Sequence, residues 1–162
     1  MPVERGVVTF VGRNPFCALG TWLGVVGNNQ EAMSEANVAV VRGMWEAFLR
    51  KDGATSLAAF DPDIEWDGTN LPDGKVSRGL EAVTEHIASW AEIWETWEVE
   101  LEDVIDAGED RVIAFFWERG HSKVGIEMNE RHSELYLVRD GKIVYRKGFS
   151  DADEALVEAG LL

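Results

Sequence analysis

Residues 135–144 have the sequence LYLVRDGKIV, in which Asp140-Gly141 separates two apolar runs. An Asp-Gly pair between alternating apolar residues is a strong signal for a β-hairpin, because its tight turn needs two residues that accept a positive φ. The pattern predicts a long strand over 124–138 and a return strand over 142–149. Upstream of them, alternation of period two predicts strands over 99–105 and 111–119, with a break at 120–123. We therefore expect an antiparallel meander in the second half of the chain.

The residues before this meander have helical spacing instead. Apolar side chains recur every three or four residues from Ser34, a candidate N-cap, to about residue 51, and again over 80–94. A short helix is expected over 54–60, because a residue that precedes a proline, here Pro62, avoids helical conformation. Between the helices we expect a short strand at 64–66 and a loop over 68–79.

A terminal helix is expected over 152–159, capped by Asp151 and closed by Gly160. Helices followed by an antiparallel sheet indicate the α+β class.

The charge of the chain is uneven. The 162 residues include 30 acidic and 15 basic ones, for a net charge of −15. Residues 1–32 hold two of each sign, so residues 33–162 carry the whole net charge. We expect 1–32 to be a poorly ordered extension and 33–162 to be the domain. The alternative, a signal peptide, is weakened by the glycines that interrupt the apolar run 16–26.

Composition excludes several kinds of partner. A strongly acidic chain is repelled by phosphate backbones and anionic membrane surfaces, so we expect no nucleic acid and no membrane as partner. The single cysteine, Cys17, cannot form an internal disulfide, and no Cys/His cluster has zinc-ligand spacing. The sequence also has no phosphate-binding loop or nucleophile elbow. We expect a cytoplasmic protein without metal or cofactor.

Three segments together resemble a known family. They are FDPDIEW at 60–66, the hairpin LYLVRDGKIV at 135–144 and DADEALVEAGL at 151–161. In this order and spacing they are similar to the nuclear transport factor 2-like superfamily, in particular its SnoaL-like and ketosteroid isomerase-like branch. The resemblance implies a cone-shaped, curved antiparallel sheet wrapped by three N-terminal helices, with a short C-terminal helix. It also implies an apolar pocket inside the cone and a homodimer formed through the outer face of the sheet.

The resemblance also bears on the reaction. Isomerase-like members carry a general-base carboxylate at the end of the first strand, where this chain has Trp66; Asp67 follows one residue later, on the opposite face of a strand. The family's oxyanion-hole tyrosine falls near Met44 or Trp45, neither of which has a hydroxyl group. Steroid-isomerase chemistry is therefore not expected.

A third family position, acidic or histidine, falls on the strand before the Asp140-Gly141 turn. Counted from that turn it is Glu134, or Ser133 if the loop shifts by one residue, and the two would face opposite sides of the sheet. Arg146 on the return strand would face Glu134. The pair is interpreted either as an acid/base group with a helper that lowers its pKa or binds an anionic substrate, or as a cross-strand salt bridge.

Two histidines are further catalytic candidates. His132 shares the predicted face of Glu134, and His86 borders the apolar face of the helix expected at 80–94. Surface, interface or core roles remain open for both. The aromatic candidates for substrate contact, with packing as the alternative, are Trp45, Trp66, Trp90 and Tyr136.

The expected function is binding of a small apolar or aromatic molecule in the cone. If the protein is an enzyme, the resemblance implies cofactor-free acid/base chemistry of the isomerase, cyclase or dehydratase type. The alternatives are a non-catalytic ligand-binding or accessory domain and an epoxide hydrolase-type enzyme.

Overall fold

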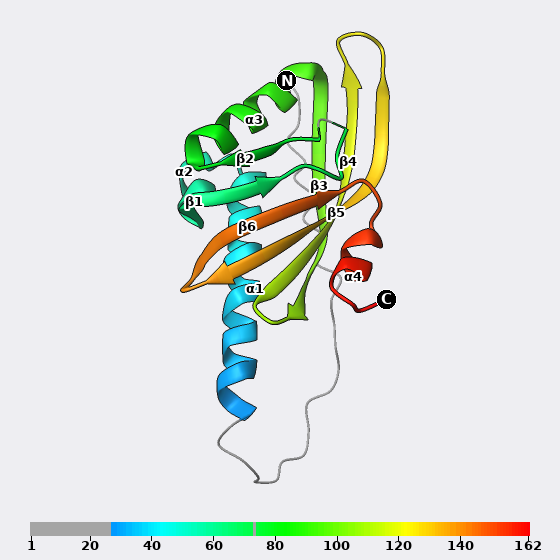
Figure 1. Cartoon of the computed structure of the whole chain (residues 1–162). Helices are drawn as coiled ribbons and strands as arrows, with labels where there is room; N and C mark the ends of the chain where they lie inside the picture. The colour runs from blue at the N-terminus through cyan, green and yellow to red at the C-terminus, as the bar shows by residue number, and fades with distance from the viewer. Residues whose placement is uncertain (1–26, 73) are drawn as a thin grey trace.

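The computed structural model describes residues 27–72 and 74–162 (Figure 1). Along the chain the elements are α1 (Gly27–Leu49), α2 (Gly53–Ala58), β1 (Phe60–Asp67), β2 (Val76–Arg78), α3 (Leu80–Ile93), β3 (Trp94–Gly108), β4 (Arg111–Ser122), β5 (Glu127–Arg139), β6 (Lys142–Phe149) and α4 (Glu154–Glu158). Three helices precede the long strands and one short helix follows them, which confirms the predicted α+β class.

The six described strands form one curved sheet in the order β2-β1-β6-β5-β4-β3. Neighbouring strands are antiparallel except for β1 and β6, which are parallel. On one face, α1 packs on β3–β6 and α3 packs on β1–β3, whereas α4 packs on β5 and β6. The two faces bury separate apolar clusters, and the larger one, which includes Val41, Tyr136 and Ile143, lies between α1–α3 and the sheet. The helices thus enclose the concave side of the sheet.

The hairpin between β5 and β6 forms where the sequence predicts it. Asp140 and Gly141 have φ values of 50° and 74°, so both residues adopt the left-handed conformation that a type I′ turn needs. The register across this hairpin then pairs Tyr136 with Arg146 and Glu134 with Gly148. This turn therefore sets which side chains of β5 and β6 share a face.

The start of the first helix differs from the prediction. α1 begins at Gly27, so Ser34 lies inside the helix and is not its N-cap. Residues 30–33 are Gln, Glu, Ala and Met, which are good helix formers and let the helix continue toward the N-terminus. The boundary at residue 33 stays a prediction, and residues 1–26 of the expected extension lie outside the described residues.

The strands β1, β3 and β4 are longer than the sequence suggests, whereas β5 begins later than predicted and β6 has the predicted bounds. β1 covers 60–67, β3 begins at Trp94, and the predicted loop over 68–79 contains β2. Gly120 does not break β4: it pairs with Trp97 and Met128, and a Cβ there would be 2.7 Å from Trp94 Cε3, so glycine allows this close approach. His121, expected in a turn, consequently lies within β4. These differences arise from cross-strand pairing, which local propensity does not report.

A tryptophan-lined cavity as the candidate functional site

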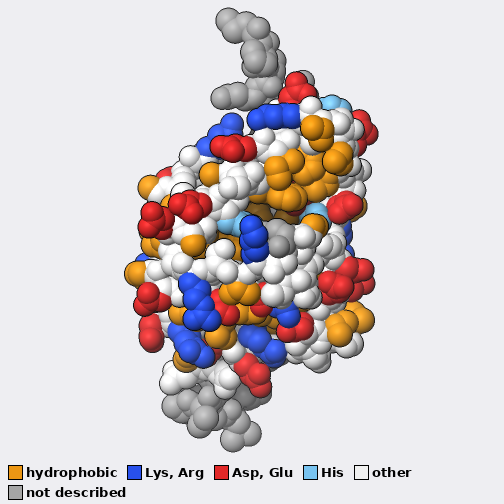
Figure 2. Space-filling view, turned by 45° about the horizontal axis from the view of Figure 1, so that its top comes forward, with side chains coloured by type: hydrophobic (Ala, Val, Ile, Leu, Met, Phe, Trp, Pro, Cys, Tyr) orange, Lys and Arg blue, Asp and Glu red, His pale blue; other side chains and the backbone are white. Residues whose placement is uncertain are grey.

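A cavity of about 590 Å³ lies between the concave face of the sheet and helices α1, α2 and α3. Its volume is within the usual range for small-molecule sites, roughly 300–1,000 Å³. Hydrophobic side chains continue to the surface beside it: Ile126, which lines the cavity, is 60% exposed. Figure 2 shows hydrophobic side chains gathered among acidic and basic ones on one face of the molecule.

All eight predicted site residues line this cavity. They come from five different elements and are Trp45, Trp66, His86, Trp90, His132, Glu134, Tyr136 and Arg146. Their placement shows which side chains a bound molecule could meet, and their catalytic and substrate-binding roles remain predictions.

Glu134 and Ser133 both border the cavity, but it is the Glu134 carboxylate that joins the side chains inside it, whereas the Ser133 hydroxyl is engaged elsewhere. The Ser133 hydroxyl donates to the backbone oxygen of Asp151, 3.1 Å away. On β1 the alternation of the strand turns Trp66 toward the cavity and Asp67 away from it, where Tyr145 donates a 2.7 Å hydrogen bond to Asp67 Oδ2. Asp67 is therefore not at the family's general-base position.

Glu134 lies at the end of a chain of hydrogen bonds. Trp45 Nε1 donates to the Tyr136 hydroxyl at 3.0 Å, and that hydroxyl donates to Glu134 Oε2. Arg146 Nη2 donates to Glu134 Oε1 in an ion pair of which both partners are buried. Burial, together with the nearby Glu134 carboxylate, raises the pKa of Tyr136 well above its ordinary value. The hydroxyl stays protonated, and both oxygens of Glu134 accept hydrogen bonds.

The Arg146 guanidinium is held by three neighbours. Its central carbon lies 4.0 Å from the centre of the Trp66 ring, which is a cation–π distance. A Cβ on Gly148 would come within 2.9 Å of both Nη1 and Nη2, so the guanidinium occupies the space left by the missing side chain. Arg146 is therefore a fixed partner of Glu134.

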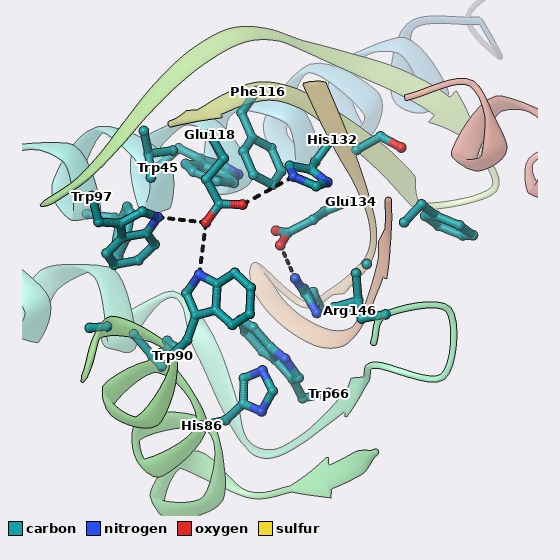
Figure 3. Close-up of a pocket in the computed structure, with 18 of the residues that line it drawn as sticks. Trp45, Trp66, His86, Trp90, Trp97, Phe116, Glu118, His132, Glu134 and Arg146 are labelled. Atoms are coloured by element: carbon teal, nitrogen blue, oxygen red, sulfur yellow. Dashed lines mark hydrogen bonds and ion pairs between the residues drawn. The ribbon is translucent and has the colours of Figure 1, made fainter. Parts of the chain in front are cut away.

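A second carboxylate, Glu118 on β4, points into the same cavity (Figure 3). Its Oε1 accepts hydrogen bonds from Trp90 Nε1 at 2.9 Å and Trp97 Nε1 at 2.7 Å. Its Oε2 lies 3.5 Å from His132 Nε2, which is also 3.8 Å from Glu130 Oε2. Both Glu118 and His132 are largely buried. The structure thus places a carboxylate–imidazole pair beside the Glu134 network.

Glu118 and Trp97 are two residues of the cavity that were not among the predicted site residues. The sequence does contain a signal for Glu118, because alternation along β4 puts this residue on the same face as the apolar Ala114 and Phe116. An acidic residue at an inward position of an apolar strand is a candidate for function. Trp97 lies between the helix expected over 80–94 and the strand expected over 99–105, where neither helical spacing nor strand alternation applies.

No group of three or more His, Cys, Asp or Glu side chains among the described residues is arranged to hold a metal ion. None of the helices in the described part of the chain has the length and apolar character needed to cross a membrane.

Comparison with known sequences gives the family. The SnoaL-like domain profile matches residues 41–146, which include β1 and nearly all of the cavity wall. The chain belongs to the SnoaL-like domain family. None of the curated proteins compared with it matches.

Solved structures with the same fold extend the comparison of this SnoaL-like domain. A nuclear transport factor 2-like protein from Burkholderia thailandensis is 26% identical with a TM-score of 0.65, over 77% of this chain and 95% of that one. TerC co-crystallised with polyporic acid is 20% identical with a TM-score of 0.63, over 76% and 97%. A Mycobacterium tuberculosis protein in complex with estradiol-17beta-hemisuccinate is 19% identical with a TM-score of 0.58, over 73% and 95%. The predicted nuclear transport factor 2-like fold is confirmed.

Proposed function

We propose that this SnoaL-like domain binds a flat apolar or aromatic small molecule in its cone and transfers a proton to or from it without a cofactor. The observation that carries the proposal is the Glu118–His132 pair inside a tryptophan-lined cavity. The two neighbours crystallised with small molecules support the binding part. The reaction types that fit are isomerisation, cyclisation and loss of water.

His132 is the group proposed to exchange the proton. Imidazole is the side chain most suited to this at neutral pH, and a carboxylate on one ring nitrogen orients the ring for transfer through the other. Glu118 Oε2 lies at ion-pair distance from His132 Nε2, which has no hydrogen-bond partner among the described residues, and Nδ1 is the atom proposed to exchange the proton with a bound molecule. The ring also packs on Phe116, with centroids 5.7 Å apart. Glu118 is thus proposed as a positioning residue for His132.

Glu134, the acid/base candidate from the sequence, takes a different role in this proposal. Tyr136 and Arg146 donate hydrogen bonds to both oxygens of Glu134. Glu134 is therefore proposed to make this side of the cavity polar and not to accept a proton from the ligand. The same observation favours the second candidate, a non-catalytic binding domain. That candidate needs the aromatic cavity but no reactive group.

One experiment separates the two candidates. Acetonaphthone, an aryl methyl ketone, is first titrated into the protein while tryptophan fluorescence is recorded, and exchange of its methyl protons in heavy water is then followed by NMR. We expect saturable binding and exchange above the buffer rate, with His132→Asn lowering the exchange by about 10²–10⁴-fold at unchanged binding. Glu118→Gln should lower it as well.

The matched control is Trp117→Phe, because Trp117 lies on the opposite face of β4 and does not line the cavity. It should leave both binding and exchange unchanged. Binding without exchange above buffer would replace the enzyme by the binding domain, and absence of binding to any aromatic probe would refute both.

A further inference from the structure

The charge inside the cone is unbalanced. The lining residues include four carboxylates, Glu118, Glu127, Glu130 and Glu134, and one guanidinium, Arg146. Glu127 and Glu130 are exposed at the opening, so the buried charges are those of Glu118, Glu134 and Arg146, a net of one negative charge when His86 and His132 are neutral. Clefts lined by one sign of charge concentrate ligands of the opposite sign. With neutral histidines the cavity therefore disfavours an anionic ligand.

The negative charge that has no basic partner is located at Glu118. Arg146 is already paired with Glu134, and within the described residues no lysine or arginine forms an ion pair with Glu118. Glu118 is only 8% exposed, and its hydrogen-bond donors are two neutral indoles. A buried carboxylate without a full countercharge is costly, and a cation placed beside it recovers that cost.

The walls around Glu118 suit the same kind of group. Trp90 and Trp97 meet at its carboxylate, and Trp45 lies close by against Phe116, with centroids 4.8 Å apart. Ring faces attract cations, whereas Trp90 and Trp97 turn their N–H edges toward Glu118, so here the carboxylate supplies the attraction for a cation and the indoles supply flat apolar surface. A ligand with an ammonium group near Glu118 could place its rings against these indoles.

From these three observations we infer that the molecule bound in the cone carries a positively charged amino or quaternary ammonium group, which lies beside Glu118. The inference rests on the proposed function, since it specifies the ligand of the same cavity. It distinguishes a cationic aromatic ligand from a neutral or acidic one of equal shape.

Three probes with one ring system test it. Naphthylmethyl-trimethylammonium carries a permanent charge, neopentylnaphthalene is its uncharged isostere, and naphthylacetate carries a negative charge. Dissociation constants are measured by tryptophan fluorescence and by calorimetry. We expect the cation to bind at least about tenfold more tightly than the isostere, and the anion to bind most weakly.

Variants of the protein test whether the preference for the cationic probe arises at Glu118. Glu118→Gln should bring the cation and the isostere to similar affinities, while Glu118→Asp keeps the charge and should keep the order of affinities. The control is Glu127→Gln, because this side chain is 86% exposed at the opening and its charge is screened. Circular dichroism confirms that each variant is folded.

The possible failures are distinct. Equal binding of all three probes, or a preference that survives in Glu118→Gln, would overturn the inference and leave the binding function intact. Equal affinities of cation and isostere in the unmodified protein would mean that His132 already neutralises Glu118, which also overturns it. Absence of binding by every probe would overturn the proposed function itself.

Discussion

The guanidinium of Arg146 stacks on the indole of Trp66, with its central carbon 4.0 Å from the ring centre. The same guanidinium donates to Glu134, so one cation contacts both an aromatic wall residue of the cone and a buried carboxylate. This arrangement neutralises Glu134 internally. It leaves the other buried carboxylate, Glu118, as the group in the cavity that a bound molecule or His132 has to balance.

The Glu134–Arg146 ion pair gives a first prediction. Arg146→Met should lower the free energy of unfolding by about 3–5 kcal/mol, because it leaves Glu134 buried without a countercharge. The double variant Arg146→Met/Glu134→Leu should recover most of that loss, since neither partner is then charged. Urea unfolding of the single and double variants measures both effects. Additive losses in the double variant would contradict the coupling.

Gly148 gives a second prediction. Its replacement by alanine puts a methyl group within 2.9 Å of the Arg146 guanidinium and of Leu71 Cδ1. Gly148→Ala should cost about 1–3 kcal/mol of stability because the guanidinium has to leave the Trp66 face. The matched control is Gly43→Ala, which meets nothing within 4 Å in α1 and should stabilise by up to about 1 kcal/mol. An equal response of the two variants in urea unfolding would argue against this packing.

Alkaline pH gives a third prediction. The chain has two tyrosines, and burial is the main cause that raises the pKa of each above its ordinary value of about 10. In the folded protein, tyrosinate absorbance should therefore appear only well above this pH, whereas in denaturant both tyrosines should titrate near it. Native titration near pH 10 (about the model-peptide value) would show that Tyr136 is not buried as described.

The same shifts determine how stability depends on pH. Above about pH 10 the unfolded chain releases phenolic protons that the folded chain keeps, so stability is complete below that pH and falls as pH rises. The slope is at most about 1.4 kcal/mol per pH unit for each tyrosine. Tyr136→Phe should make it shallower, which unfolding curves recorded at several alkaline pH values would measure. An unchanged slope in that variant would contradict the assignment.

Trp90 gives a fourth prediction, on ligand binding. Trp90→Phe removes one of the two indole donors to Glu118 and part of the cavity wall. The affinity for an aromatic probe such as acetonaphthone should fall by about tenfold, because both the contact area and the orientation of Glu118 change. Trp117→Phe on the outer face is the control and should leave the affinity unchanged. Equal losses in both variants would place the ligand elsewhere.

Part of the candidate site could be predicted from the sequence, namely the residues that share one face of a single strand. Alternation along 124–138 groups Glu130, His132, Glu134 and Tyr136 on one side, and the Asp140-Gly141 turn aligns this side with Arg146. Alternation does not say which side is inner, because neither face of this strand is purely apolar. The choice depends on which face α1 and α3 cover, and those contacts join residues far apart in the chain.

By itself, the sequence determined the class, the element order apart from β2, the hairpin and the grouping of side chains along β5, because these follow from local periodicity and turn chemistry. Only the tertiary structure decided that Glu134 faces inward, that Gly120 allows close approach instead of breaking β4, and that Trp90 and Trp97 meet at Glu118. The physical reason is that a cavity exists only where several helices and strands enclose the same space. Curvature of the sheet and packing of the helices bring α3, β3, β4 and β5 around one space, and no local pattern encodes that meeting.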